Sequence, residues 1–279
     1  MIGVELLSLI RRPRTWFAIA LLCGLPTAVA LVVHFSGLAP RPGAGPAFLS
    51  QVFTNGTLFA PAALALVMPV FLPAAVAVVA GDSIAGEASA GTLRYLLIRP
   101  AGRTRLLVAK LLSSAVFVLL AVVIVSLVGY LVGTRLFGSG HVSQYGVTGR
   151  GGVVPLSGGR PLTQSELMAR FGAAVLYVGV SMLGVAAVAL LLSTLTRSGL
   201  PASLGAVAVL LTSQALDVLD AAGMLRPYLP THYWLSFVDF FRNPILWTDI
   251  ERGLLLQAAY VVVLLGAAWA WFTTKDITT

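Results

Sequence analysis

Six long apolar runs constrain this chain more than any other feature, because each is long enough to cross a bilayer as a helix. They cover residues 15–35, 57–80, 108–133, 171–195, 199–222 and 253–273. Only 10% of the 279 residues are charged, whereas a soluble domain carries about 25%. The sequence therefore predicts a single domain over residues 1–279, an all-α membrane protein with six transmembrane helices.

The N-terminal segment, residues 1–14, predicts a short amphipathic helix in the cytoplasmic headgroup layer. A signal peptide is the rival interpretation of the first run, because Ala28-Val29-Ala30 resembles a cleavage site. The apolar run continues to Val33, however, and Glu5 precedes the arginines. We therefore expect the first run to remain as a membrane span.

Basic residues predict the orientation of the chain, since six spans place both termini on the same side of the membrane. Ten basic residues fall in the segments on the side of the termini and eight on the other side, but the first set of segments is much shorter. Its density of positive charge is therefore higher. We expect a multi-pass protein of the plasma membrane with both termini in the cytoplasm.

Three prolines interrupt the second run: Pro61, Pro69 and Pro73. Each removes a helical hydrogen bond, so the helix should kink or leave carbonyls that neighbouring helices must cover. A broken helix in a membrane is tolerated where it meets protein or lines a water-filled route. The prolines are therefore candidates for lining a pathway, although packing alone could explain them.

Two outer segments have distinctive compositions. Residues 134–166 are rich in glycine and predict a flexible outer loop with room for a short strand pair. Residues 226–250 mix aromatic residues with Asp239, Arg242 and Asp249. This mixture favours an interfacial or re-entrant helix before the sixth span.

The segment between the second and third runs is the most informative polar stretch. A helix is predicted over residues 84–99, and Pro100 ends it. Its Leu93, Leu96 and Leu97 lie on one face. Such a helix either floats among the lipid headgroups or docks in a groove on a cytoplasmic partner.

This segment carries a motif of an acid, Gly-Thr-Leu, further leucines, a proline, basic residues and a lysine near the start of the next span. The residues are Glu87, Gly91, Thr92, Leu93, Leu96, Leu97, Arg99, Pro100, Arg103, Arg105 and Lys110. The motif resembles the cytoplasmic loop of ABC type-2 transporter permeases. The opening Glu5 with Arg11-Arg12-Pro13-Arg14-Thr15-Trp16, and the stretch Leu229-Pro230-Thr231-His232-Tyr233-Trp234, are also similar to that family.

The resemblance implies the transmembrane (permease) subunit of an ATP-binding cassette exporter. Such a subunit dimerises or pairs with a related permease, and two separate cytoplasmic ATPase subunits bind its coupling helix. ATP-driven closure of the ATPases moves that helix, and the spans alternate access. By this resemblance the partner-binding residues are Glu87, Gly91, Thr92, Leu93, Arg94, Leu96, Leu97, Arg99 and Pro100.

The resemblance also assigns ATP and Mg²⁺ to the partner subunit. A P-loop needs Gly-Lys-Ser/Thr, and the lysines of this chain, Lys110 and Lys275, do not follow a glycine. We therefore predict no enzymatic activity, no catalytic residues and no cofactor in this chain. Lys110 is expected to reach the near membrane surface with its long side chain.

Other candidate sites are weak. His34, His141 and His232 lack a metal-binding spacing, and the single cysteine, Cys23, cannot form a cysteine metal cluster. Asp217 and Asp220 could relay protons, but hydration or pairing with Arg226 also explains them. The net charge of +8 comes mostly from arginines at the ends of apolar runs, so we predict no nucleic-acid partner.

Two other functions stay open at the level of sequence. One is an ion- or proton-coupled carrier that works without an ATPase, and the other is a membrane anchor or assembly subunit. The transported substrate and the choice between homodimer and heterodimer do not follow from the residues.

Overall fold

The computed structural model describes Leu7, Leu9 and residues 11–37, 48–49, 52, 55–89, 103–138, 146–149, 152–155, 163–219 and 223–274. Among these residues, six helices are long and apolar enough to cross a membrane, which confirms the predicted all-α transmembrane fold. They are α2 (Pro13–Ser36), α4 (Phe71–Ser89), α6 (Arg103–Phe137), α7 (Gln164–Leu195), α8 (Gly199–Val218) and α9 (Trp247–Thr274).

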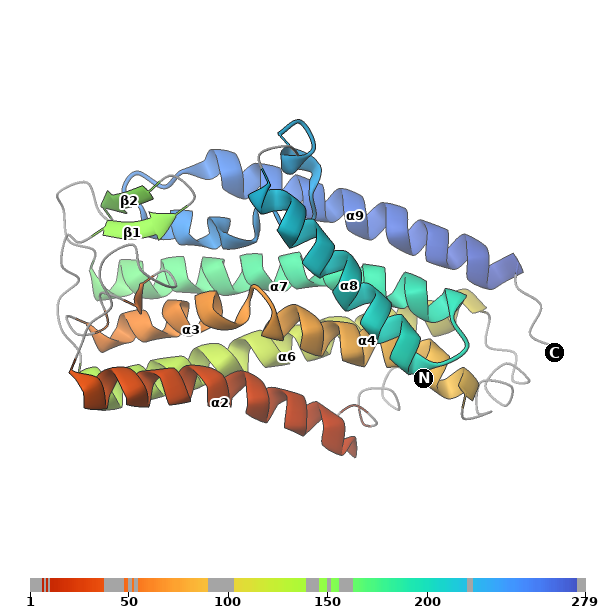
Figure 1. Cartoon of the computed structure of the whole chain (residues 1–279), viewed down its shortest axis with the longest axis horizontal. Coiled ribbons are helices and arrows are strands. Elements are labelled where there is room, and N and C mark those ends of the chain that lie inside the picture. Colours follow the sequence, from red (N-terminus) through yellow and green to blue (C-terminus); the bar gives the residue numbers. More distant parts are fainter. Residues whose placement is uncertain are drawn as a thin grey trace.

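Helices α2, α4, α6, α7 and α9 run roughly along the long axis of the molecule (Figure 1). Helix α7 lies at the centre, and α8 crosses obliquely over α4 and α7. Helix α2 begins at the same end of the bundle at which α4 ends, α6 begins and α9 ends. We call this the inner end and the opposite one the outer end.

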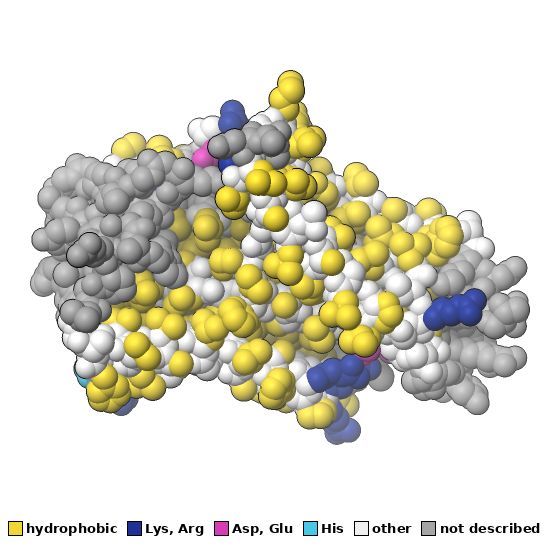
Figure 2. All heavy atoms as spheres, in the orientation of Figure 1, with side chains coloured by type: hydrophobic (Ala, Val, Ile, Leu, Met, Phe, Trp, Pro, Cys, Tyr) yellow, Lys and Arg dark blue, Asp and Glu magenta, His cyan; other side chains and the backbone are white. Residues whose placement is uncertain are grey.

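The surface of the bundle is apolar along its length. Figure 2 shows hydrophobic side chains over the middle of one face, with Lys and Arg atoms at the end where α2 begins. The most apolar part of α7 is 56% buried within the protein, whereas that of α9 is only 17% buried. Helix α9 therefore lies at the periphery, where side chains such as Leu255 and Val262 would face lipid.

Glycines allow backbones to approach closely inside the bundle. The Gly56 N–H donates to the Gly138 carbonyl at 3.0 Å. A Cβ added at Gly133 of α6 would lie 2.1 Å from the Gly56 carbonyl oxygen, so only glycine fits there. In lipid there is no hydrophobic driving force between helices, so helices associate through close packing, and small residues of this kind permit it.

The second apolar run forms separate helices rather than one continuous span. They are the 3₁₀ helix η2 (Gly56–Leu58), α3 (Phe59–Val67) and α4, with a break at Met68–Val70. Pro69 lies in the break, and the Gln214 side chain of α8 donates to its carbonyl. The expected interruption is therefore present, and a neighbouring helix covers the carbonyl that Pro73 cannot bond.

Helix α4 continues to Ser89, beyond the predicted span boundary at residue 80. It also includes the first residues of the helix predicted over 84–99, so that Ile84–Ser89 extend the span and do not begin a new element. Polar partners on α2, α6 and α7 make this extension possible, as described below. Residues 90–102 lie outside the described residues.

The connections that follow α6 and α8 contain short strands and 3₁₀ helices. Residues 146–155 contain an antiparallel pair of strands, β1 (Gly146–Gly149) and β2 (Gly152–Pro155), in which Val147 pairs with Val154. The segment 226–250 forms two 3₁₀ helices, η4 (Arg226–Tyr228) and η5 (Trp234–Phe241), before α9 begins at Trp247.

Of the two alternatives predicted for residues 226–250, an interfacial or a re-entrant helix, the burial of η5 argues against the interfacial one. Trp234, Phe237, Phe240 and Phe241 of η5 are buried in the protein. They fill the space beside α7 and α9. Arg170 of α7 donates hydrogen bonds to the backbone carbonyls of Phe240 and Arg242 at the end of η5. These carbonyls therefore have a partner within the protein, whereas those of an interfacial helix would bond to water.

Candidate functional site

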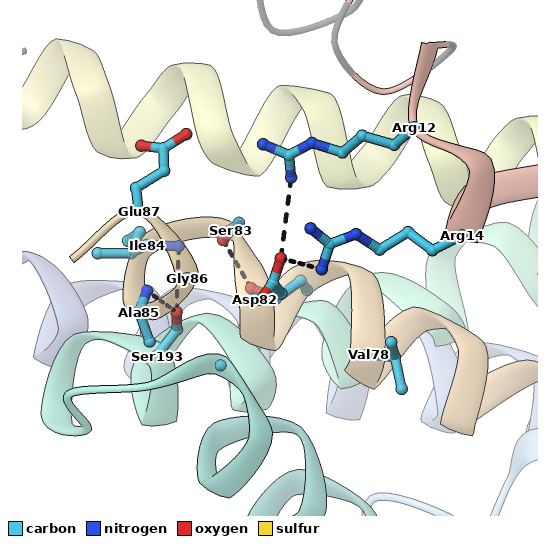
Figure 3. A network of polar contacts seen from close by, with 12 residues as sticks. Arg12, Arg14, Val78, Asp82, Ser83, Ile84, Ala85, Gly86, Glu87 and Ser193 are labelled. Atoms are coloured by element: carbon cyan, nitrogen blue, oxygen red, sulfur yellow. Dashed lines mark hydrogen bonds and ion pairs between the residues drawn. The ribbon is translucent and has the colours of Figure 1, made fainter. Parts of the chain in front are cut away.

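Asp82 of α4 lies between two arginines at the inner end of the bundle (Figure 3). The Arg14 guanidinium donates to Asp82 Oδ2, and Arg12 Nη1 lies 3.9 Å from the same oxygen. Arg14 belongs to the first turn of α2, and Arg12 directly precedes that helix. The contact therefore ties the beginning of α2 to α4.

Two glycines make room for the Asp82 carboxylate. A Cβ at Gly199, the first residue of α8, would lie 2.2 Å from Asp82 Oδ1, and a Cβ at Gly86 would lie 2.4 Å from it. Gly81 is equally close to α8, where a Cβ would lie 2.7 Å from Ser203 Oγ. The start of α8 is thus in direct contact with α4.

Glu87, one turn beyond Asp82, forms an ion pair with Lys110 of α6. The Lys110 side chain is only 2% exposed. The sequence predicted that Lys110 reaches the membrane surface, and this prediction was wrong, because Glu87 offers the ammonium a partner inside the bundle. A buried charge of this kind is tolerated when it is paired.

Ser193, in the last turns of α7, binds the same part of α4. Its Oγ accepts hydrogen bonds from the backbone N–H groups of Ile84 at 3.2 Å and Ala85 at 2.9 Å. The end of α4 is therefore joined to α2, α6, α7 and α8. We call Arg12, Arg14, Asp82, Glu87, Lys110 and Ser193 the inner-end cluster.

A cavity of about 20 Å³ lies within this cluster, lined by charged and hydroxyl side chains that include Arg14, Asp82, Lys110 and Ser114. A polar cavity of this size holds about one water molecule. A water molecule at this position would hydrate the ion pairs.

Of the predicted site residues, Glu87 lies in the inner-end cluster. The remaining predicted partner-binding residues, from Gly91 to Pro100, lie outside the described residues. Among the prolines, Pro61 and Pro73 are buried in α3 and α4, and Pro69 lines a larger cavity at the break between these helices.

Sequence reasoning missed the roles of Arg12, Arg14 and Asp82. A signal for them existed, because an acid at the inner end of one run and arginines at the inner end of another must lie at the same depth. The pairing itself depends on which helices are neighbours.

Near the C-terminal end of α8, which lies about midway along the long axis of the molecule (Figure 1), Asp217 lies 2.5 Å from His232, measured from Oδ1 to Nδ1. Arg226 Nε donates to the Asp217 backbone carbonyl at 2.8 Å. Asp220 and His141 lie outside the described residues. His34 packs edge-on against Phe35 and Phe137.

The segment Tyr228–Trp234, which we call the outer segment, is held by side chains from three helices. Tyr177 of α7 donates to the Tyr233 carbonyl at 2.6 Å. Gln257 and Tyr260 of α9 donate to the carbonyls of Pro230 and Tyr228 at 2.7 and 2.8 Å. Ser213 of α8 shares a hydrogen bond of 2.8 Å with Thr231.

A cavity of about 160 Å³ lies between the outer segment, the end of α8 and the break in the second run. Its lining consists of Met68, Pro69, Gln214, Asp217, Val218, Thr231, His232, Trp234 and Leu235. Across the part of the chain that the structure describes, no group of three or more His, Cys, Asp or Glu side chains could hold a metal ion.

Comparison with protein-family models gives a match over most of the chain. A family model described as a protein of unknown function, DUF2705, matches residues 30–278, from within α2 through α9. No curated protein matches the chain. Because the family model covers most of the sequence, the chain belongs to the DUF2705 family.

Proposed function

We propose that this protein is the permease subunit of an ATP-binding cassette exporter, and that ATP hydrolysis occurs in a separate cytoplasmic subunit. The observation that carries the proposal is the ion pair between Glu87 and Lys110. These residues are the first and last of the loop motif, and the pair brings together the two helices that flank it.

The anchoring of α4 supports a role in transmitting force. The inner end of this helix contacts α2 through Asp82, α6 through Glu87 and α7 through Ser193. A partner that pushes on residues 88–102 would therefore act on several spans together. If the segment that follows α4 only lay among the lipid headgroups, these contacts between the end of α4 and the other helices would not be required.

The distribution of charge supports a cytoplasmic inner end. Arg11, Arg12, Arg14 and Arg105 all belong to inner-end segments, and Arg11, Arg14 and Arg105 are exposed. Basic residues beside short loops favour the cytoplasmic side of the membrane. An ATPase and its nucleotide are available only on that side.

The proposed partners are cytoplasmic ABC ATPase subunits and a second permease, either another copy of this chain or a related one. The proposed localisation is the plasma membrane with both termini in the cytoplasm. ATP and Mg²⁺ would bind to the ATPase subunits.

The decisive experiment is co-purification with an ABC ATPase encoded in the same genome, using Leu96→Asp and the double variant Glu87→Arg with Lys110→Glu, which keeps an ion pair at the buried position. Both variants should lose the ATPase and ATP-driven efflux while still inserting into the membrane. Glu251→Arg, which makes the same charge change on an exposed residue in the first turns of α9, is the matched control. Normal efflux in both variants would contradict the proposal.

A second candidate function is an ion- or proton-coupled carrier that acts without an ATPase. The contact between Asp217 and His232 beside a cavity favours it, because paired titratable groups near a membrane pathway can carry protons. Transport into proteoliposomes that contain this chain alone, driven by a pH gradient, would support the carrier.

A further inference from the structure

A groove of about 380 Å³ lies between the outer parts of α2 and α6, two helices that pack against each other (Figure 1). Its lining consists of Thr27, Leu31, Leu131, Val132, Arg135 and Leu136. Sites that bind small molecules have volumes of about 300–1,000 Å³. The groove is therefore large enough to hold part of a ligand.

The walls of the groove are largely hydrocarbon and face out of the bundle. Leu31 is 40% exposed and Leu131 is 48% exposed. The Thr27 hydroxyl donates to the Cys23 carbonyl at 2.7 Å, so its proton is already used within α2. Exposed apolar side chains on a membrane-spanning bundle face the acyl chains of the lipid. The groove therefore opens toward the bilayer.

Arg135, in the last turn of α6, is the charged residue of the groove. Between Lys110 in the inner-end cluster and Arg135, helix α6 rises by about 38 Å. The hydrocarbon core of a bilayer is about 30 Å thick, and the bilayer with its headgroups measures about 40–45 Å. Arg135 therefore lies at the level of the outer headgroups, above the apolar part of the groove.

The Arg135 guanidinium is exposed, and it forms no hydrogen bond or ion pair with the residues that the structure describes. The connections that follow α2 and α6 cannot supply a carboxylate, because residues 38–54 and 138–162 contain no Asp or Glu. They contain three further arginines, Arg41, Arg150 and Arg160. The guanidinium is therefore available to an anion that comes from outside the chain.

We propose that this groove binds an anionic phospholipid of the outer leaflet. One acyl chain would lie along Leu31, Leu131 and Val132, and the phosphate would accept hydrogen bonds from the Arg135 guanidinium. Arginine suits this role because its planar fork of donors matches two phosphate oxygens. Basic residues between transmembrane helices recognise acidic lipid headgroups in this way.

A second copy of the chain is a less suitable occupant of the groove. A dimer contact with two-fold symmetry uses the same surface on both copies. Helices α2 and α6 contain no Asp or Glu, so such a contact would cover Arg135 without giving it a carboxylate. A covered charge without a partner is costly, whereas a lipid phosphate neutralises it.

The test uses the full-length chain in detergent, without any ATPase, and titrates it with dioleoyl phosphatidylglycerol or with zwitterionic dioleoyl phosphatidylcholine. Native mass spectrometry counts the bound lipids and gives both affinities. The wild type should bind the anionic lipid about tenfold more tightly than the zwitterionic one. Arg135→Gln should remove most of this preference. Arg252→Gln, which removes an exposed arginine in the first turns of α9, should keep it.

A second variant tests the groove instead of the charge. Leu31 is partly exposed, so the larger side chain of Leu31→Trp can fill the groove from its rim without entering the core. This variant should bind both lipids more weakly. Glycerol 1-phosphate, which has the headgroup charge but no acyl chain, should not displace the lipid from the wild type.

Four results would overturn the inference: equal affinity for the two lipids, an unchanged preference in Arg135→Gln, wild-type lipid binding in Leu31→Trp, or displacement by glycerol 1-phosphate. A lipid-free dimer that Leu31→Trp dissociates would also overturn it, because the groove would then be an interface between copies. None of these results bears on the ATPase partner, and failure of ATPase co-purification leaves the lipid result intact.

Discussion

Glu87 on α4 and Lys110 on α6 form an ion pair in which the lysine side chain is 2% exposed and the glutamate side chain 14% exposed. The two residues are separated by 23 positions in the chain, and the connection between them includes the segment predicted to bind a partner. The ion pair therefore holds together the two ends of that connection.

Reversal of one charge should destabilise the protein strongly. In Lys110→Glu two carboxylates face each other in a buried place, and breaking a buried pair costs about 3–5 kcal/mol. The double variant Glu87→Lys with Lys110→Glu should recover most of the loss. Thermal unfolding in detergent, followed by size-exclusion chromatography, measures both. A double variant as unstable as the single one would contradict the pairing.

The glycine contact between α6 and η2 predicts a second effect. Gly133→Ala places a methyl group 2.1 Å from the Gly56 carbonyl oxygen, so the helices must separate and the melting temperature must fall. Gly179→Ala on α7 is the matched control, because nothing lies within 4 Å of its added methyl group. Alanine there should be neutral or stabilise the helix by about 0.5–1 kcal/mol. Equal melting temperatures for the two variants would contradict the close contact.

The hydrogen bonds to the outer segment predict a graded loss of stability. Tyr177→Phe removes a buried bond of 2.6 Å to the Tyr233 carbonyl but keeps the ring that packs on Phe240. The loss should be about 1 kcal/mol. Tyr260→Phe removes an exposed bond of 2.8 Å and should cost less. A larger fall in melting temperature for Tyr260→Phe than for Tyr177→Phe would contradict this prediction.

Asp239 of η5 predicts a dependence of stability on pH. Burial raises the pKa of its carboxyl above the ordinary value of 3.8, although Arg242 opposes the shift. A raised pKa in the folded state means that protonation favours folding, so this contribution is present below pH 3.8 and is lost as the pH rises through the folded-state pKa.

The wild type should therefore gain stability relative to Asp239→Asn as the pH falls toward 4. Melting temperatures of both proteins between about pH 4 and 8 give the difference, which cancels the titration of all other groups. A constant difference across this range would mean that the Asp239 pKa is not raised.

The sequence was sufficient to predict that six helices could span a membrane, and that the second apolar run is interrupted near Pro69. Apolar runs identify membrane helices because lipid accepts no unpaired polar backbone, and proline removes a defined hydrogen bond. Both signals are local in the sequence, so they can be recognised without knowing which helices pack against each other.

The candidate sites depended on neighbours and were only partly predictable. The choice of Glu87 as the partner of Lys110, and of His232 as the partner of Asp217, follows from helix packing. The burial of Phe237 and Phe241 likewise depends on a gap between α7 and α9 that no local pattern encodes. Acids and bases at matching ends of apolar runs narrow the possibilities but do not select the pair.

The break at Met68–Val70 gives α4 a pivot of its own. From Phe71 to Ser89 the helix is about 28 Å long, so a tilt of about 10° at the break swings its far tip by about 5 Å. Helix α3, on the other side of the break, stays packed on α6. A tilt of α4 about this break would change the shape of the cavity that Met68 and Pro69 line.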